Sequence, residues 1–332
     1  MRKQPLAVIG AGSWGTALAI QLARNGHPVS LWGRDAVALD AMAATRTNAR
    51  YLPDVTLPDA LAVYRDLRDI GDATTAALIA VPSEAFRTTL QRIAGEMPQL
   101  ADIVWATKGI EVGTGKLLEE LVTEELGDVR RAVLSGPSFA LEVARGQPTA
   151  VTAASRDSAF ATQVAEWFHS DTFRVYTSDD VTGVEFGGAL KNVLAIAAGI
   201  ADGLGFGANA RAALITRGLN ELLRLGDQAG ARRETLMGLA GVGDLVLTCT
   251  DNQSRNRRLG LALGRGESLD AARASIGQAV EGATTARVVR HIAKKAGVEM
   301  PIHEQVFAIL YEGQSPREAV TELLAREAGL EF

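Results

Sequence analysis

The sequence contains few cysteine, histidine and aromatic residues. One of its 332 residues is cysteine (Cys249), four are histidine, and aromatic residues make up 5%. A single cysteine excludes a disulfide within the chain and is typical of a protein from a reducing compartment. The four histidines are scattered and show no spacing typical of zinc ligands. We therefore expect no metal site.

The sequence also lacks an excess of positive charge and a long hydrophobic run. Its formal net charge of -5 argues against a general nucleic-acid-binding protein, and the basic cluster 255–258 is too short to reverse this. The apolar stretch 193–201 is too short to span a bilayer. The N-terminal apolar residues are interrupted by glycines, unlike those of a signal peptide. We expect a cytoplasmic protein with no integral membrane segment and no nucleic-acid partner.

Short apolar runs alternate with helical patterns through the first half of the chain. Apolar runs that end at glycine or proline are typical of buried parallel strands. The predicted strands are 6–9, 29–32, 76–81, 103–106 and 132–135, extended by 149–152 and 173–176, and the predicted helices include 13–25, 83–95 and 115–126. This alternation predicts an α/β Rossmann-type domain over residues 1–179, with a doubly wound, mostly parallel sheet.

Strand signals stop near residue 180, and helical patterns follow. The predicted helices are 184–201, 208–226, 254–264, 269–276, 284–296, 304–311 and 316–328. We therefore expect an all-α C-terminal domain over residues 180–332. A chain of this length exceeds most single cores, and it has no proline- or serine-rich linker. Both features favour two closely packed domains with a ligand cleft between them.

A glycine-rich loop joins the first predicted strand to the first predicted helix. Residues 10–15 read Gly-Ala-Gly-Ser-Trp-Gly, the G-x-G-x-x-G pattern. In this context Gly10 permits a tight turn, Gly12 lets the backbone approach a pyrophosphate, and Gly15 lets the helix pack on the sheet. Free N–H groups and the helix dipole then attract phosphate. The loop predicts a dinucleotide site; the alternative is a glycine-rich turn in another kind of α/β protein.

The end of the second predicted strand bears on the choice of dinucleotide. An acidic residue there binds the ribose 2′-hydroxyl of NAD, whereas an arginine accommodates the 2′-phosphate of NADP. Arg34 and Asp35 are adjacent, and Arg34 lies nearer the strand end. We predict that NADP(H) is preferred and that NAD(H) is possible. Otherwise Arg34 is an ordinary surface cation.

Lys191 is a lone charge in a run of small and apolar residues. Residues 187–194 read Gly-Gly-Ala-Leu-Lys-Asn-Val-Leu. Burial of an ammonium is costly, and desolvation lowers a lysine pKa so that proton transfer near neutral pH becomes feasible. On a helix, Gly187 and Gly188 lie one turn before Lys191 and leave room for a ligand. Two interpretations stay open: a buried lysine with a catalytic role, or a surface lysine whose stem covers apolar neighbours.

Further polar residues follow strands or precede helices. Lys108 lies just beyond a predicted strand, at the edge where open α/β sheets bind ligands, and the loop 135–140 ends the next strand. Taken singly, either segment is more simply an ordinary junction between a strand and a loop. Asp244, in a glycine-flanked turn, either pairs with a nearby lysine or caps a helix. Arg255 lies at a helix start that suits a phosphate, although a solvated basic helix face is the common alternative. These residues are compatible with a small phosphorylated substrate.

Taken in chain order, these segments closely resemble one family. They are Gly10–Gly15, Trp105–Gly109, Ser135–Phe139, Gly188–Asn192, Gly203–Arg211, Gly241–Thr250, Ser254–Arg257 and Val280–Gly282. The set is similar to the bacterial NAD(P)-dependent glycerol-3-phosphate dehydrogenases along almost the whole chain. The resemblance implies an oxidoreductase that reversibly reduces dihydroxyacetone phosphate to sn-glycerol 3-phosphate with NAD(P)H. That product feeds glycerophospholipid synthesis.

The resemblance also implies roles for individual residues. Lys191 matches the catalytic proton donor or acceptor. The positions implied at the substrate are Lys108, Gly136, Ser138, Lys191, Asp244, Ser254, Arg255 and Asn256. Those expected at the cofactor are the loop glycines Gly10, Gly12 and Gly15, with the implied Ser13, Trp14, Arg34, Lys108, Ala140, Arg255 and Glu281. A homodimer is expected as well.

Two other functions stay open from the residues alone. One is a related two-domain dehydrogenase that acts on a hydroxy acid or a sugar. The other is a cofactor-sensing binding protein without turnover. Such a sensor would share the glycine loop, but it would need neither Lys191 nor Asp244.

Overall fold

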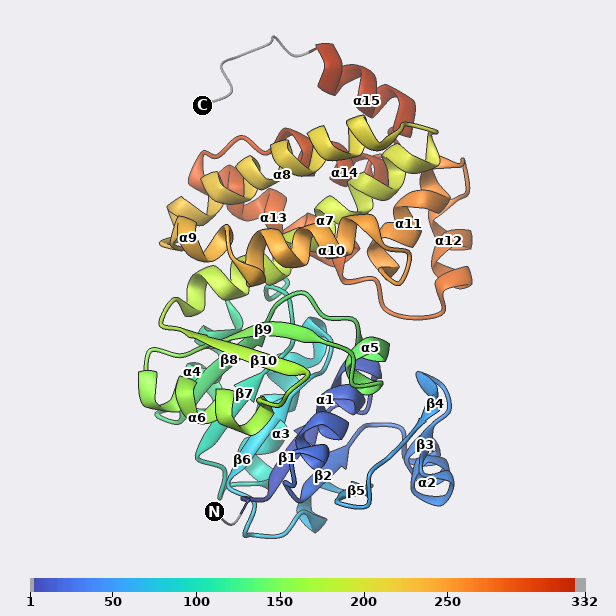
Figure 1. Ribbon diagram of the computed structural model, residues 1–332. Coiled ribbons are helices and arrows are strands. Elements are labelled where there is room, and N and C mark those ends of the chain that lie inside the picture. Colours follow the sequence, from blue (N-terminus) through green and yellow to red (C-terminus); the bar gives the residue numbers. More distant parts are fainter. Residues whose placement is uncertain (1–2, 326–332) are drawn as a thin grey trace. The chain divides into compact units, whose positions relative to one another are not determined.

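The computed structural model describes residues 3–325, and the chain divides into two compact units. Unit 1 comprises residues 1–109 and 116–185, and unit 2 comprises residues 110–115 and 186–332 (Figure 1). The long helix that begins at Val181 starts in unit 1 and continues into unit 2.

Unit 1 is built on an eight-stranded sheet in the order β10-β9-β8-β7-β6-β1-β2-β5. Its strands are β1 (Leu6–Ile9), β2 (Val29–Trp32), β5 (Leu61–Tyr64), β6 (Ala76–Ile79), β7 (Asp102–Trp105), β8 (Arg130–Ser135), β9 (Thr149–Ala154) and β10 (Phe173–Ser178). Every neighbouring pair is parallel except β8 and β9. The predicted doubly wound, mostly parallel sheet is therefore confirmed. Sequence patterns missed β5 and a small hairpin of β3 (Thr47–Asn48) and β4 (Leu52–Thr56).

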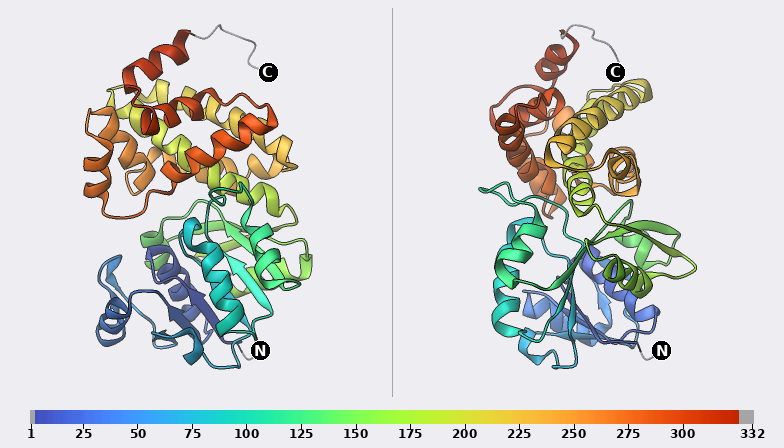
Figure 2. Two further views of the ribbon diagram at one scale, coloured as in Figure 1. Left: turned by 180° about the vertical axis from the view of Figure 1, so that it is seen from behind. Right: turned by 90° about the vertical axis from the view of Figure 1, so that its left-hand side faces the viewer.

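Helices cover both faces of this sheet. They are α1 (Ser13–Arg24), α2 (Ala36–Thr45), α3 (Phe86–Glu96), α4 (Leu118–Leu126), α5 (Ala140–Ala144) and α6 (Ser158–Phe168), with 3-10 turns at Leu67–Asp69 and Ser83–Ala85. Helices α1 and α6 lie on one face, and α3 and α4 lie side by side on the other (Figure 2). Because both faces are covered, the central strands are buried along their length, which explains their continuous apolar sequences.

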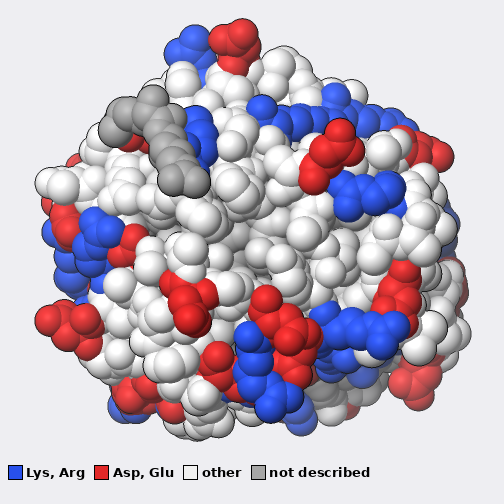
Figure 3. All heavy atoms as spheres, turned by 90° about the horizontal axis from the view of Figure 1, so that it is seen from below, with Lys and Arg blue, Asp and Glu red and all other residues white. Residues whose placement is uncertain are grey.

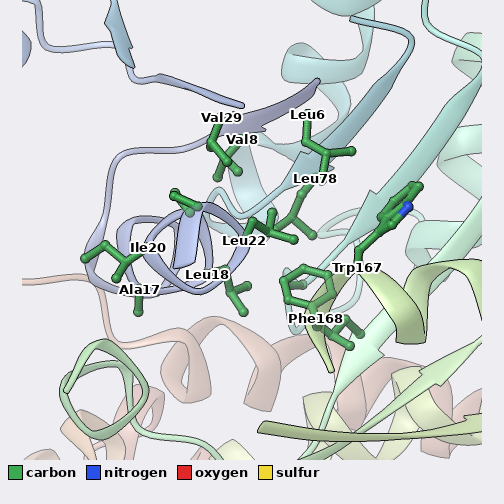
Figure 4. Close-up of a cluster of buried hydrophobic side chains, with 14 of the residues drawn as sticks. Leu6, Val8, Ala17, Leu18, Ile20, Leu22, Val29, Leu78, Trp167 and Phe168 are labelled. Carbon is green, nitrogen blue, oxygen red and sulfur yellow. The ribbon is translucent and has the colours of Figure 1, made fainter. Parts of the chain in front are cut away.

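One part of the core of unit 1 lies between the sheet and helices α1 and α6. Leu22 of α1 lies beside Leu78 of β6, whereas Leu18 points toward Phe168 of α6 (Figure 4). This packing fixes the start of α1 at the carboxyl end of β1, where the glycine loop joins the two elements.

Unit 2 is helical, as predicted. Its helices are α7 (Val181–Gly203, from residue 186), α8 (Ala208–Ala229), α9 (Arg233–Leu236), α10 (Asp244–Thr250), α11 (Arg255–Gly264), α12 (Leu269–Ile276), α13 (Glu281–Ala296), α14 (Pro301–Tyr311) and α15 (Pro316–Ala325), with a π-helical turn at Leu239–Gly243. The end of the helix predicted for 316–328 lies outside the described residues. Sequence patterns missed α9 and α10.

Helix α7 is long and apolar enough to cross a membrane by length and composition. All of its most apolar window is buried within the protein. Central core helices pass the same test, so α7 alone is weak evidence for a membrane span.

Glycines bring α7 and α11 into backbone contact. A Cβ added to Gly260 would lie 2.0 Å from the carbonyl oxygen of Ile196, and one added to Gly199 would lie 2.1 Å from that of Arg257. Gly203 and Gly264 repeat this contact further along the two helices. Side chains larger than hydrogen at these positions would force the helices apart. The close approach holds the first turn of α11 beside the middle of α7.

Charges of both signs are interspersed on the face of the molecule drawn in Figure 3, around a broad area without charged side chains. Neither sign gathers there into a single field.

Candidate functional site

The glycine loop has a different constraint at each of its glycines. Gly10 has a φ of +125°, and a Cβ there would lie 2.5 Å from the carbonyl oxygen of Ala80. A Cβ on Gly15 would lie 1.9 Å from the carbonyl oxygen of Gly10. At Gly12, by contrast, a Cβ would meet no atom within 4 Å. Gly10 and Gly15 therefore serve the turn and the packing, whereas Gly12 leaves open space in front of α1.

The first turn of α1 is suited to an anion in that space. Gly12 is the N-cap residue and provides no side-chain hydrogen bond to the helix. The indole N–H of Trp14 is buried, and within residues 3–325 it has no hydrogen-bond partner. Open space, helix N–H groups and an unpaired buried donor together fit the diphosphate of a dinucleotide.

Arg34 and Asp35, which follow β2, differ in whether their charged groups have a partner within the protein. Asp35 is the N-cap of α2, and its Oδ1 accepts a hydrogen bond of 3.1 Å from the N–H of Ala38. Arg34 is exposed and forms no ion pair with any described residue. The carboxylate is thus already used for capping, while the guanidinium next to it is available.

Lys108 and Ser138 meet at one carbonyl group. Lys108 follows β7, and its Nζ donates to the carbonyl oxygen of Gly136 over 3.1 Å. The hydroxyl of Ser138 donates to the same oxygen over 3.0 Å. Gly136 has a φ of +151°, and a Cβ there would lie 2.8 Å from the Cα of Val151. The structure therefore brings together these three predicted residues of unit 1, just before α5 begins at Ala140.

Lys191 is buried in unit 2. Its side chain is 8% exposed, and its Nζ donates to Oδ1 of Asp244 over 2.5 Å and to Oγ1 of Thr248 over 2.8 Å. The side chain of Asp244 is 1% exposed. A buried ammonium is tolerated only when paired and hydrogen-bonded, and here both conditions are met. The interpretation of Lys191 as a surface lysine is therefore wrong.

The approach of Asp244 to Lys191 depends on Gly187. A Cβ on Gly187 would lie 2.5 Å from the carbonyl oxygen of Ala240, in the π-helical turn. The predicted room for a ligand at Gly187 is thus wrong, because backbone fills it. The predicted turn at Asp244 is also wrong, since Asp244 is the first residue of α10 and directly follows the π-helical turn.

Thr248 is a member of this cluster that sequence patterns missed. Its hydroxyl donates to the carbonyl oxygen of Asp244 over 2.6 Å and accepts from Lys191. Thr248 lies four residues after Asp244, so both side chains lie on one side of α10. Identifying residues 244–250 as a helix would have revealed this pairing.

A second polar network connects α7, α11 and α13. Asn256 donates from Nδ2 to Oδ1 of Asn192 over 2.9 Å, and its own Oδ1 accepts from the N–H of Gly282 over 2.9 Å. A Cβ on Gly282 would lie 2.5 Å from the carbonyl oxygen of Asn192. The predicted residues Asn256 and Glu281 are therefore held beside Asn192, which follows Lys191 in the chain. Asn192 had not been singled out from the sequence.

The basic segment at the start of α11 is not a uniformly solvated face. Ser254 caps the helix by accepting from the N–H of Arg257 over 3.2 Å. Arg257 is buried, pairs with Asp202 and donates to the carbonyl oxygen of Cys249. Arg255 is half-buried, and its Nη1 donates to Oε1 of Gln278 over 3.4 Å. Arg255 is thus positioned by its surroundings, while Arg257 has a structural role.

No group of three or more histidine, cysteine, aspartate or glutamate residues that could hold a metal ion occurs in the part of the chain that the structure describes.

Glu185 is a buried carboxyl group in unit 1. It accepts hydrogen bonds from Nε1 of Trp105 over 2.9 Å and from the N–H of Glu119 over 3.2 Å. Burial, and secondarily the charge of Glu119, raise the pKa of Glu185 to about 8, although the hydrogen bonds oppose this shift. Glu185 is therefore largely protonated in the folded protein at neutral pH.

Glu185→Gln is expected to flatten the dependence of stability on pH. The folded-state pKa lies above the ordinary value of 4.5, so the contribution of Glu185 to stability is complete below that value and is lost as the pH rises through about 8. Between about pH 6 and 8 the wild type should lose about 2 kcal/mol relative to the variant, measured by urea unfolding. Glu166→Gln, at an exposed position, is the control and should keep the wild-type slope. Parallel curves for the wild type and Glu185→Gln would contradict the assignment.

Comparison with known proteins gives consistent matches along the chain. The family model of the NAD-dependent glycerol-3-phosphate dehydrogenase N-terminus matches residues 5–161, and that of the C-terminus matches residues 180–321. The glycerol-3-phosphate dehydrogenase (NAD(P)+) of Thioalkalivibrio sulfidiphilus is 62% identical over 100% of both chains. That of Nitrosococcus oceani is 59% identical over 98% of this chain and 95% of its own. The solved structure of glycerol-3-phosphate dehydrogenase from Coxiella burnetii has a TM-score of 0.94 at 51% identity and covers 98% of this chain and 100% of its own.

Proposed function

Because the chain belongs to the NAD-dependent glycerol-3-phosphate dehydrogenase family, we propose that it reversibly reduces dihydroxyacetone phosphate to sn-glycerol 3-phosphate with NAD(P)H. The chain is thus an oxidoreductase, and the resemblance seen in its motifs is confirmed. The observation that carries the proposed chemistry is the buried cluster of Lys191, Asp244 and Thr248, which places a charged proton donor among groups that hold it.

The nicotinamide cofactor, when bound, supplies the hydride. We assign its diphosphate to the glycine loop, with Gly12 giving close approach and Ser13 and Trp14 offering donors at the start of α1. The open space at Gly12 and the unpaired indole N–H of Trp14 support this assignment. Lys108, Ala140, Arg255 and Glu281 are proposed as further cofactor contacts.

The substrate is held by cations and polar groups. Arg255 and Asn256, at the capped start of α11, are proposed to bind the substrate phosphate, since guanidinium and helix N–H groups both favour this anion. Ser254, as the cap, positions them. In unit 1, Lys108 and Ser138, which both donate to the Gly136 carbonyl, are also proposed as substrate-binding residues.

Lys191 is proposed to deliver a proton to the oxygen of the substrate ketone as the carbonyl carbon is reduced. Asp244 keeps the ammonium charged, and Thr248 fixes the position of Nζ. The positive charge also stabilises the developing alkoxide, an effect worth a few kcal/mol at comparable oxyanion sites. In the reverse direction Lys191 accepts the proton from the hydroxyl group.

The proposal is tested by following loss of NADPH absorbance with a panel of carbonyl compounds. Dihydroxyacetone phosphate should be turned over, while dihydroxyacetone without phosphate should be much poorer, because it lacks the group assigned to Arg255. Turnover of 2-oxo acids in place of phosphorylated ketones would contradict the proposal and favour a hydroxy-acid dehydrogenase. Cofactor binding without turnover of any compound would favour a sensor.

Arg34→Ala is expected to weaken the binding of NADPH about tenfold and to leave the binding of NADH almost unchanged. A charged hydrogen bond to phosphate is worth about one order of magnitude in affinity. The exposed guanidinium of Arg34 and the capping role of Asp35 support a preference for NADP(H). The ratio of the KM values for the two cofactors measures this effect. An equal loss for both cofactors would remove the assignment.

A cytoplasmic location, a homodimer and a supply of sn-glycerol 3-phosphate to glycerophospholipid synthesis complete the proposal. Light scattering of the purified protein tests the dimer. Depletion of the protein in a cell, followed by measurement of phospholipid content with and without added glycerol 3-phosphate, tests the metabolic role.

A further inference from the structure

Two segments, each with an exposed arginine, converge on Ala11 in the glycine loop. A Cβ built on Gly33, at the end of β2, would lie 2.9 Å from the Cβ of Ala11. Asn48 on the β3–β4 hairpin is buried and donates from Nδ2 to the carbonyl oxygen of Ala11 over 3.1 Å. Arg34 directly follows Gly33, and Arg50 lies two residues after Asn48. Both arginines are therefore tied to the same point of the cofactor loop.

The hairpin is fixed firmly at this point. Asn48 also donates to Oγ1 of Thr16 on α1, over 2.8 Å. Arg46, which follows α2 and directly precedes β3, donates to the carbonyl oxygens of Leu61 and Pro58 over 2.9 and 2.5 Å. Arg46 is thus used to hold the chain together, and its guanidinium is engaged by carbonyl groups.

Arg50, unlike Arg46, has an exposed side chain. Within residues 3–325 it forms no ion pair. Its guanidinium lies 5.2 Å from the centre of the Tyr51 ring. Tyr51 itself packs against the core of unit 1, as do Ala11 and Trp14 of the glycine loop. Stacking on a fixed ring lowers the cost of ordering the arginine when an anion binds.

We propose that Arg50 is a second ligand of the 2′-phosphate of NADP(H) and acts together with Arg34. The inference rests on the cofactor preference proposed above. In this kind of loop the adenosine ribose lies at the end of the second strand, next to the residues that follow Gly33. A phosphate dianion there is best neutralised by two guanidinium groups, each of which can bind it in a bidentate manner. NAD(H) lacks this phosphate, so Arg50 contributes to the discrimination between the cofactors.

The test measures binding of adenosine 2′,5′-bisphosphate and adenosine 5′-monophosphate to the full-length protein by calorimetry. Arg50→Ala should lower the affinity for the bisphosphate about tenfold and leave the affinity for the monophosphate unchanged. Arg50→Lys should recover part of the loss, because it keeps the charge without the fork of donors. Arg174→Ala is the matched control: Arg174 is exposed on β10, at the opposite edge of the sheet from β5, and removing it changes net charge alone.

Each outcome of this experiment is decisive. Selective weakening of the bisphosphate by Arg50→Ala, but not by Arg174→Ala, supports the inference. If Arg34→Ala weakens the bisphosphate and Arg50→Ala does not, the role of Arg50 is overturned while the cofactor preference stands. If the wild type binds both nucleotides equally, the preference for NADP(H) fails and the role of Arg50 fails with it. Turnover is not needed for any of these readings, so they are independent of the substrate assignment.

Discussion

Lys191→Ala is expected to lower kcat by about 10²–10⁴, the range for loss of a general acid. The ammonium that delivers the proton is removed, and Asp244 is left without its cationic partner. Binding of NADPH should be nearly unchanged, because the residues assigned to the cofactor diphosphate lie in the glycine loop. Steady-state kinetics with dihydroxyacetone phosphate measure the first quantity, and fluorescence titration with NADPH measures the second.

The control for this variant is Lys295→Ala, which removes an exposed lysine from α13. It should keep wild-type kcat and KM. Wild-type kcat in Lys191→Ala would refute the catalytic assignment. A low kcat accompanied by loss of NADPH binding would show that the variant is damaged more widely, and it would also contradict the account.

Asp244→Ala is expected to reduce both activity and stability. It leaves the ammonium of Lys191 buried without its anionic partner, and breaking a buried pair in this way costs about 3–5 kcal/mol. The kcat should fall by about 10² or more, since Lys191 is no longer held charged and in place. Urea unfolding and steady-state kinetics measure the two effects.

A double variant separates the structural role of the pair from its chemical role. In Lys191→Met/Asp244→Leu, both charges are replaced by apolar groups of similar volume, so most of the lost stability should return. Activity should stay at the level of Lys191→Ala. If the double variant regained activity along with stability, the pair would be structural and the mechanism proposed here would be wrong.

The sheet and the helices of unit 2 could be predicted because their signals are local. Strands such as β1 and β6 lie in continuous apolar runs that end at glycine or proline, and helices such as α8 and α13 show regular amphipathic spacing. The hairpin of β3 and β4 had no such signal. Its position depends on the side chains of Asn48 and Arg46, whose hydrogen-bond partners are distant in sequence.

Candidate site residues could be named from the sequence, but their contacts could not. Lys191 and Asp244 could be named from their unusual surroundings in the sequence, yet the partner of each depends on packing. The π-helical turn can pack against α7, and so bring Asp244 to Lys191, only because Gly187 has no side chain. Thr248 and Asn192 were missed because they gain their roles from helix–helix contacts, and the raised pKa of Glu185 follows from burial that no local pattern reveals.

The most direct test of the role of Lys191 is a crystal structure of the protein with NADP+ and dihydroxyacetone phosphate, a pair that cannot react. The account predicts that Nζ of Lys191 lies within about 3 Å of the ketone oxygen, with Asp244 and Thr248 still in contact with it. A ketone oxygen held by another donor, with Nζ of Lys191 out of hydrogen-bonding reach, would contradict the account.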